Sequence, residues 1–113
     1  MPDIGEVWQL RRGDVLLGEI TITEPDWPWL YGRFVAEEAF EAVASLFAEE
    51  LTLSQVINHD DSEEAVDAWE AAYGQISETL TLISPTGRPV AAYLLHIDGD
   101  DAWFRWDDEP FNE

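Results

Sequence analysis

The sequence predicts an α+β fold: a single domain in the order β-β-α-α-β-β-β, whose antiparallel sheet carries two helices on one face. Apolar and polar residues alternate in segments at both ends of the chain, whereas the middle repeats its apolar residues every three or four positions. Strands gathered on either side of a helical middle are typical of this class. The 113 residues suffice for one hydrophobic core, so we expect one acidic domain over 1–113 with a frayed tail over 107–113.

Two strands are expected at the start of the chain, over 6–12 and 15–23, with a turn at Gly13-Asp14. Alternation places Trp8 and Leu10 on the core face of the first strand, and Leu17 on the outer face of the second. Four residues form the expected core face of the second strand: Leu16, Gly18, Ile20 and Ile22.

The segment 24–33 contains two prolines and a glycine, which predicts an ordered loop, because proline disfavours both central strands and helices. It also holds Trp27, Trp29 and Tyr31, the densest aromatic group in the chain. These three side chains could line a ligand pocket or cover one end of the core.

A first helix is expected over 36–51, with its apolar stripe at Phe40, Val43, Phe47 and Leu51. The remaining surface of this helix is acidic and is interpreted as a solvated face, made of Glu37, Glu38, Glu41, Glu49 and Glu50. Residues 52–61 are either a continuation of the helix or a linker.

A second helix begins at Asp61 or Ser62, and Glu64 is spaced to complete a capping box on Asp61. Its apolar stripe is Val66, Trp69, Tyr73 and Ile76. A strand then follows over 79–84, and the turn 85–88 leads into the C-terminal hairpin.

The hairpin 90–106 is the clearest structural signal, because Asp98-Gly99 separates two alternating segments. A two-residue Asp-Gly turn pairs Tyr93 with Phe104, whereas a four-residue Asp-Gly-Asp-Asp loop shifts the partners by two and keeps the faces. The core face is the same in both cases: Ala91, Tyr93, Leu95, Ile97, Ala102, Phe104 and Trp106. The second face is the candidate binding surface, and with Trp29 from the aromatic segment its residues are Leu94, His96, Trp103 and Arg105.

The formal net charge is −20, from 25 acidic and 5 basic residues. Such a charge opposes binding to nucleic acids and anionic membranes, and it favours encounter with a basic protein partner. Acidic surfaces are also found in salt-adapted proteins, so the charge alone does not establish a binding role.

Composition and motifs predict no cofactor and no catalytic or metal-binding residues. The chain has no cysteine, which excludes disulfides and thiolate metal sites. The carboxylates of Asp98, Asp100 and Asp101 beside His96 lack the spacing of a calcium loop, and the segment 59–61 (His-Asp-Asp) reads as a polar loop. No nucleophile elbow or phosphate-binding loop is present. Without a basic leader or a long apolar run, the protein is expected in the cytoplasm.

Two segments carry a resemblance: Trp-Pro-Trp-Leu-Tyr-Gly-Arg-Phe over 27–34, and Leu-Leu-His-Ile-Asp-Gly-Asp-Asp-Ala-Trp-Phe-Arg-Trp over 94–106. With them the chain resembles a group of small acidic bacterial proteins that share the aromatic-Pro-Trp loop and this terminal hairpin. The resemblance implies a common single domain over most of the chain, and it implies no activity and no functional residues.

Three functional hypotheses follow. The first is a non-catalytic acidic binding protein for a basic partner, for example an immunity or inhibitor protein against a cationic toxin. The second is a small-ligand-binding module with a pocket roofed by the aromatic segment 27–31. The third is an enzyme that uses carboxylates, which the abundance of acidic residues leaves open.

Overall fold

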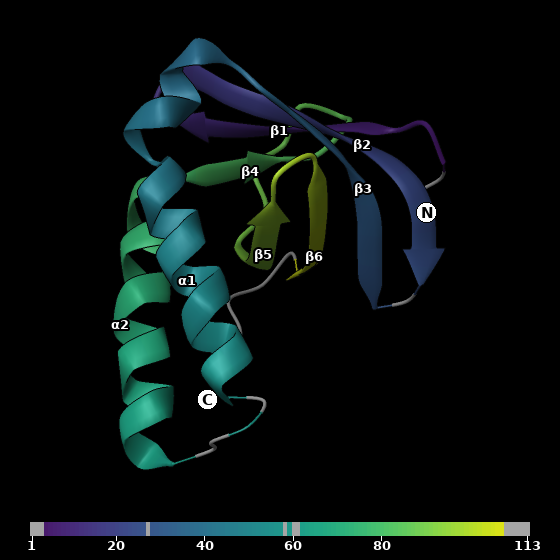
Figure 1. The fold of residues 1–113 in the computed structure, drawn as a ribbon. Coiled ribbons are helices and arrows are strands. Elements are labelled where there is room, and N and C mark those ends of the chain that lie inside the picture. The colour runs from purple at the N-terminus through teal and green to yellow at the C-terminus, as the bar shows by residue number, and fades with distance from the viewer. Residues whose placement is uncertain (1–3, 27, 58, 60–61, 108–113) are drawn as a thin grey trace.

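The computed structural model describes residues 4–26, 28–57, 59 and 62–107, and it confirms the α+β fold in one compact domain (Figure 1). The described strands are β1 (Val7–Arg12), β2 (Val15–Asp26), β3 (Trp29–Ala36), β4 (Thr81–Ile83), β5 (Ala92–Asp98) and β6 (Asp101–Asp107). The helices are a short 3₁₀ helix, η1 (Glu38–Ala42), and the α-helices α1 (Ala44–Ile57) and α2 (Glu63–Thr79). None of the described helices is long and apolar enough to cross a membrane.

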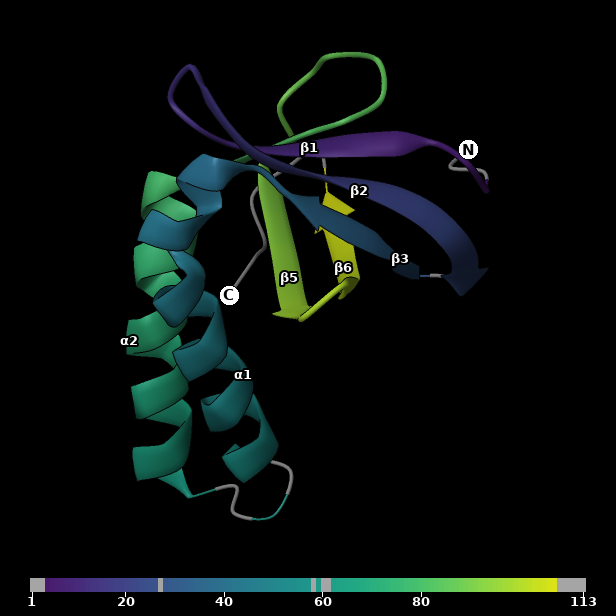
Figure 2. The ribbon, with the colours of Figure 1, turned by 45° about the horizontal axis from the view of Figure 1, so that its top comes forward.

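The six described strands form one antiparallel sheet in the order β4-β1-β2-β3-β6-β5. The N-terminal and C-terminal groups of strands therefore meet twice, where β1 pairs with β4 and where β3 pairs with β6. The sheet curls, so that the β5–β6 hairpin turns away from the plane of β1 and β2 (Figures 1 and 2). In both views α1 and α2 run side by side along one side of the strands and project beyond them.

The prediction of a loop over 24–33 is wrong for most of this segment, because β2 extends to Asp26 and β3 starts at Trp29. Pro25 is paired with Leu30 inside this ladder. The pairing of β1 with β2 begins at Thr21, and no strand of the described residues pairs with Pro25 on the side away from β3. A proline is tolerated there because its missing N–H breaks no ladder hydrogen bond.

The predicted core face of β2 is wrong at one position. Pairing shifts between Leu10 with Gly18 and Arg11 with Leu16, which leaves Leu17 as the extra residue of a β-bulge. Leu17 is fully buried and Leu16 is half-buried, the reverse of simple alternation. The bulge re-aims the strand just after the turn at Gly13.

The first helix is divided and displaced relative to its prediction. The chain forms the 3₁₀ turn over 38–42, and α1 then continues past Leu51 to Ile57. At the start of α2, Ser62 is the N-cap, and its hydroxyl accepts a hydrogen bond from the backbone N–H of Ala65 at 3.3 Å. The capping box predicted on Asp61 lies outside the described residues.

The core lies inside the curl of the sheet and includes side chains from α1 and α2. Phe47, Tyr73 and Ile76 are the buried helical members that belong to the same cluster as the strand residues. The buried strand residues are Trp8, Leu10, Leu17, Ile20, Ile22, Leu30, Phe34, Leu82, Tyr93, Leu95, Ile97, Ala102 and Phe104. Of the predicted core face of the hairpin, Trp106 is half-buried and Ala91 is exposed.

In the hairpin, Asp98 pairs with Asp101, so Gly99 and Asp100 form the turn and Gly99 has a positive φ of 62°. Tyr93 is therefore paired with Trp106, the register expected for a loop over 98–101 and not for an Asp98-Gly99 turn. The division into two faces is the same in both registers, and it places His96 beside Trp103 on the outer face.

Candidate functional site

Three adjacent strands bring aromatic side chains into one row on the outer face of the sheet. Tyr31 of β3 is paired with Trp103 of β6, and Trp103 is paired with His96 of β5. Paired residues project from the same face, and Trp29 joins them because it lies two positions before Tyr31. Pairing in the sheet thus gathers residues that are up to 74 positions apart in the chain.

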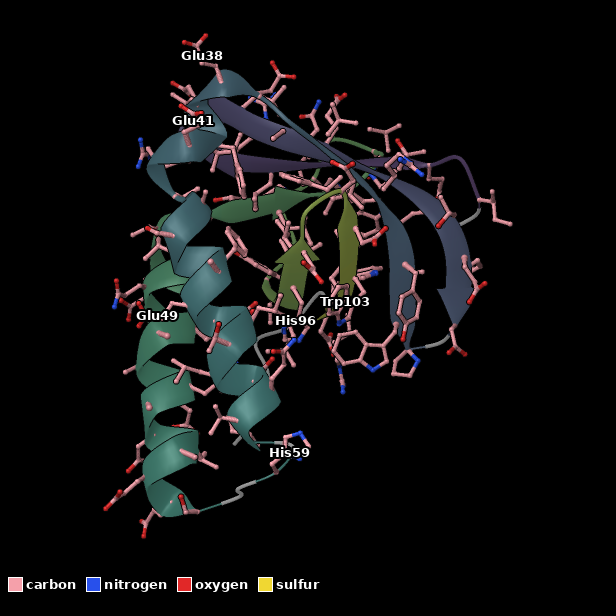
Figure 3. All side chains as sticks on the ribbon, in the orientation of Figure 1. Glu38, Glu41, Glu49, His59, His96 and Trp103 are labelled. Carbon is pink, nitrogen blue, oxygen red and sulfur yellow. The ribbon has the colours of Figure 1, made fainter. Side chains whose placement is uncertain are left out.

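The ring of His96 contacts those of Trp29 and Trp103, and together with Tyr31 these side chains form one side of a groove. The imidazole of His96 stacks on Trp29 with 5.9 Å between ring centroids, and it lies 5.5 Å from the ring of Trp103. The other side of the groove is formed by α1, which contributes Leu51, Ser54 and Gln55. The groove has a volume of about 460 Å³. Figure 3 shows His96 and Trp103 close together beside α1.

A buried carboxylate lies behind His96. Glu50 of α1 is fully buried, and its carboxylate oxygens lie 2.9–3.0 Å from Nδ1 of His96. The indole Nε1–H of Trp69 on α2 donates a second hydrogen bond to Glu50 Oε2 at 2.7 Å. A charge removed from water in this way is tolerated only with such partners. The Glu50 carboxylate therefore links α1, α2 and β5.

The assignment of Glu50 to a solvated acidic face is wrong, whereas the other predicted members of that face, Glu37, Glu38, Glu41 and Glu49, are exposed. In Figure 3, Glu38, Glu41 and Glu49 project from the outer side of the helical segment. Glu50 differs because it follows Val43 and Phe47 at helical spacing, and both of these side chains are buried.

The chemistry of this arrangement is that of an oriented imidazole. The side chain of His96 is 13% exposed, and Glu50 and the two indoles hold its ring. A carboxylate on one ring nitrogen fixes the orientation of the imidazole and leaves the other nitrogen for a ligand. The aromatic faces around it provide a surface for flat or cationic groups.

The structure brings three of the five predicted binding residues, Trp29, His96 and Trp103, into one groove. Leu94 lies elsewhere, in a second groove of about 420 Å³ between α2 and the start of β5, where Trp69 and Tyr73 also contribute. Arg105 is half-buried and lines neither of these two grooves. Trp27, the first aromatic of the predicted ligand-binding segment, lies outside the described residues.

Sequence reasoning missed Glu50 and Trp69 as parts of the site. The only local signal for Glu50 is its distance of three residues from Phe47 and seven from Val43, which places a charge on the buried stripe. Nothing local indicates that Trp69 and His96 supply its partners, because these contacts depend on how the helices meet β5.

Among the residues that the structure describes, no group of three or more His, Asp or Glu side chains comes together to hold a metal ion. The acidic residues at the tip of the hairpin belong to its turn, as Asp98 and Asp101 form the closing pair. His59 is exposed, and its neighbours Asp60 and Asp61 lie outside the described residues.

No family model, curated protein or solved structure matches the chain.

Proposed function

We propose that the protein is a non-catalytic acidic binding protein, and that the groove formed by Trp29, Tyr31, His96 and Trp103 receives a cationic side chain of a basic partner. The observation that carries this proposal is a groove walled by aromatic rings on a chain with a net charge of −20. Cations are attracted to the faces of indole and phenol rings, and the attraction is stronger where water is excluded.

The described lining of the groove carries no cation of its own, although Arg105 follows Trp103 by two residues on the same face of β6. Asp26 is the register partner of Trp29, so its exposed carboxylate is placed on the same face of the sheet. Trp103 and Trp29 would be the anchors of the contact, as aromatic residues commonly are at protein interfaces. An inhibitor-like role toward a cationic protein is consistent with this chemistry.

The test is calorimetric titration with a short basic peptide and with an acidic peptide of equal length. We expect the basic peptide alone to bind, with an affinity that falls as salt is added. Trp103→Ala should weaken this binding about 30-fold, because an anchoring aromatic is worth roughly 2 kcal/mol. Val15→Ala serves as the control, since Val15 is an exposed apolar residue at the first turn.

Absence of basic-peptide binding at low salt would overturn the proposal. Equal binding by the wild type and Trp103→Ala would show that the groove is not the binding site, and the basic peptide would then bind to the acidic surface in general.

A small-ligand-binding module is the second candidate, and the volume of the groove favours it. About 460 Å³ lies within the range of about 300–1,000 Å³ that is typical of ligand pockets. Trp29 and Trp103 would report such a ligand through a change in fluorescence. A flat response across a panel of neutral and anionic metabolites would exclude this candidate without affecting the first.

A further inference from the structure

The hydrogen bonds around Glu50 bear on which ring nitrogen of His96 carries the hydrogen and which one can accept a hydrogen bond. An indole N–H can only donate, and an ionised carboxylate can only accept. Trp69 donates to Glu50 at 2.7 Å, and His96 Nδ1 lies within 3.0 Å of the same carboxylate. When Glu50 is ionised, Nδ1 carries the hydrogen of this second contact, because a carboxylate has none to donate. In the neutral imidazole the lone pair is then on Nε2.

Nε2 is on the ring edge directed away from the buried carboxylate, and the ring itself lines the groove. Within the described part of the chain, Glu50 is the only residue that hydrogen-bonds to the His96 side chain. Glu50 thus acts as a positioning residue: it presents a hydrogen-bond acceptor among aromatic faces. A ligand that fills the groove satisfies this acceptor only if it brings an N–H or O–H donor.

We infer that the cationic group recognised in the groove is the guanidinium of an arginine side chain on the basic partner, donating an N–H to His96 Nε2. This inference rests on the proposed function and narrows it to one residue type. Guanidinium is planar, stacks on aromatic faces and donates hydrogen bonds within its plane, whereas the ammonium of lysine is a compact, strongly hydrated charge. Asp26, on the Trp29 side of the same face, offers a carboxylate to the remaining N–H groups.

Three peptides of identical length test the inference, with arginine, lysine or citrulline at the same positions. Citrulline keeps the planar shape and part of the N–H donors of arginine, but a carbonyl oxygen replaces one NH2 group and the side chain has no charge. We expect the arginine peptide to bind at least tenfold more tightly than either of the other two. Equal binding of the arginine and lysine peptides would overturn the guanidinium inference and leave the proposed function standing. Failure of both cationic peptides to bind would overturn both.

The acceptor role of His96 has its own test, in the ¹⁵N chemical shifts of the two imidazole nitrogens at neutral pH. We expect the wild type to carry its hydrogen on Nδ1. A hydrogen on Nε2, alone or in a doubly protonated ring, would overturn the inference without the use of any variant.

Glu50→Gln exchanges the donor and acceptor nitrogens of His96 with little change in the shape of side chain 50. The amide of glutamine can donate to Nδ1, which moves the ring hydrogen to Nε2. We expect this variant to show the Nε2–H tautomer and to bind the arginine peptide at least tenfold more weakly. Glu49→Gln is the matched control, since it removes the same charge from the neighbouring exposed position. If Glu50→Gln shifted the tautomer and kept full arginine affinity, the hydrogen bond to Nε2 would be refuted.

Discussion

The side chain of Tyr73 hydrogen-bonds to backbone groups on the edge strand of the sheet. Its hydroxyl donates to the carbonyl oxygen of Tyr93 at 2.7 Å and accepts from the N–H of Leu95 at 2.9 Å, both on the edge strand β5. The hydroxyl of Tyr93 in turn donates to the carbonyl of Leu80 at 2.8 Å. These bonds satisfy backbone groups that would otherwise be buried without partners.

The two tyrosines make the fold sensitive to alkali. Burial raises the pKa of Tyr73 well above its usual value, with the neighbouring Tyr93 adding to the effect, and burial likewise raises the pKa of Tyr93. In the unfolded chain both ionise near pH 10. The unfolded state then binds fewer protons than the native state, so the contribution of these two tyrosines to stability is constant below about pH 10 and is lost progressively above it. Urea unfolding across this range measures the decline.

Replacing Tyr73 by phenylalanine separates its contribution to stability from that of Tyr93. Tyr73→Phe leaves two buried backbone groups on β5 unpaired and should lower the free energy of unfolding at neutral pH by about 1–3 kcal/mol. Its alkaline decline should be shallower than that of the wild type, because one raised pKa has been removed. Tyr31→Phe, at a more exposed tyrosine, should change neutral stability by no more than about 0.5 kcal/mol. Identical alkaline slopes in Tyr73→Phe and the wild type would contradict this account.

At the scale of the elements, β2 and β3 approach closely at Gly32. A Cβ atom at this position would meet the carbonyl oxygen of Thr21 and would lie 2.9 Å from Ile20 Cγ2. The backbone oxygen cannot move without disturbing the pairing of the two strands, which continues into the groove through Tyr31. Glycine at position 32 is thus a condition for the sheet register that forms the aromatic row.

Alanine substitutions at two glycines should therefore change stability in opposite directions. Gly32→Ala should lower the free energy of unfolding by about 1–3 kcal/mol through overpacking. Gly74→Ala is the matched change within α2, where an added Cβ meets nothing within 4 Å, and it should raise stability by about 0.5–1 kcal/mol. Urea unfolding of both variants measures this. Wild-type stability in Gly32→Ala would show that the strands can separate there at little cost.

Periodicity predicted the elements whose contacts are local, such as the β5–β6 hairpin and α2, because apolar spacing decides these directly. It failed at the end of β2 and the start of β3, where the prolines indicated a loop. Whether proline is tolerated in a strand depends on whether a neighbour needs its N–H, and that is decided by how far β1 extends along β2.

The candidate site shows the same division between local and distant information. Alternation placed His96 and Trp103 on one face correctly, since they belong to one hairpin. Trp29 was named as a binding residue, but its position beside His96 depends on the pairing of β3 with β6. Glu50 was grouped with its exposed acidic neighbours although its spacing from Phe47 places it on the buried side of α1, and its contacts with Trp69 and His96 depend on tertiary packing.

For the whole molecule, the net charge of −20 destabilises the folded state but favours the binding of a basic partner. Like charges on a compact surface repel one another, so the charge opposes the folded state. The same field attracts a basic partner and speeds the encounter. Both effects are long-range, and dissolved salt weakens them together.

Raising NaCl from about 0.01 M to about 0.1 M shortens the Debye length from about 30 Å to about 10 Å. We expect the Tm of the free protein to rise, because self-repulsion is screened, while the affinity for the arginine peptide falls, because attraction is screened. Thermal unfolding and calorimetric titration in the same buffers measure the two responses. Sucrose separates screening from general stabilisation: it should raise Tm without the loss of affinity, since an excluded osmolyte leaves the charges unscreened. A Tm that falls with added NaCl would mean that attractive pairs outweigh repulsion in the folded state, and the acidic surface would then belong to stability and not to recognition.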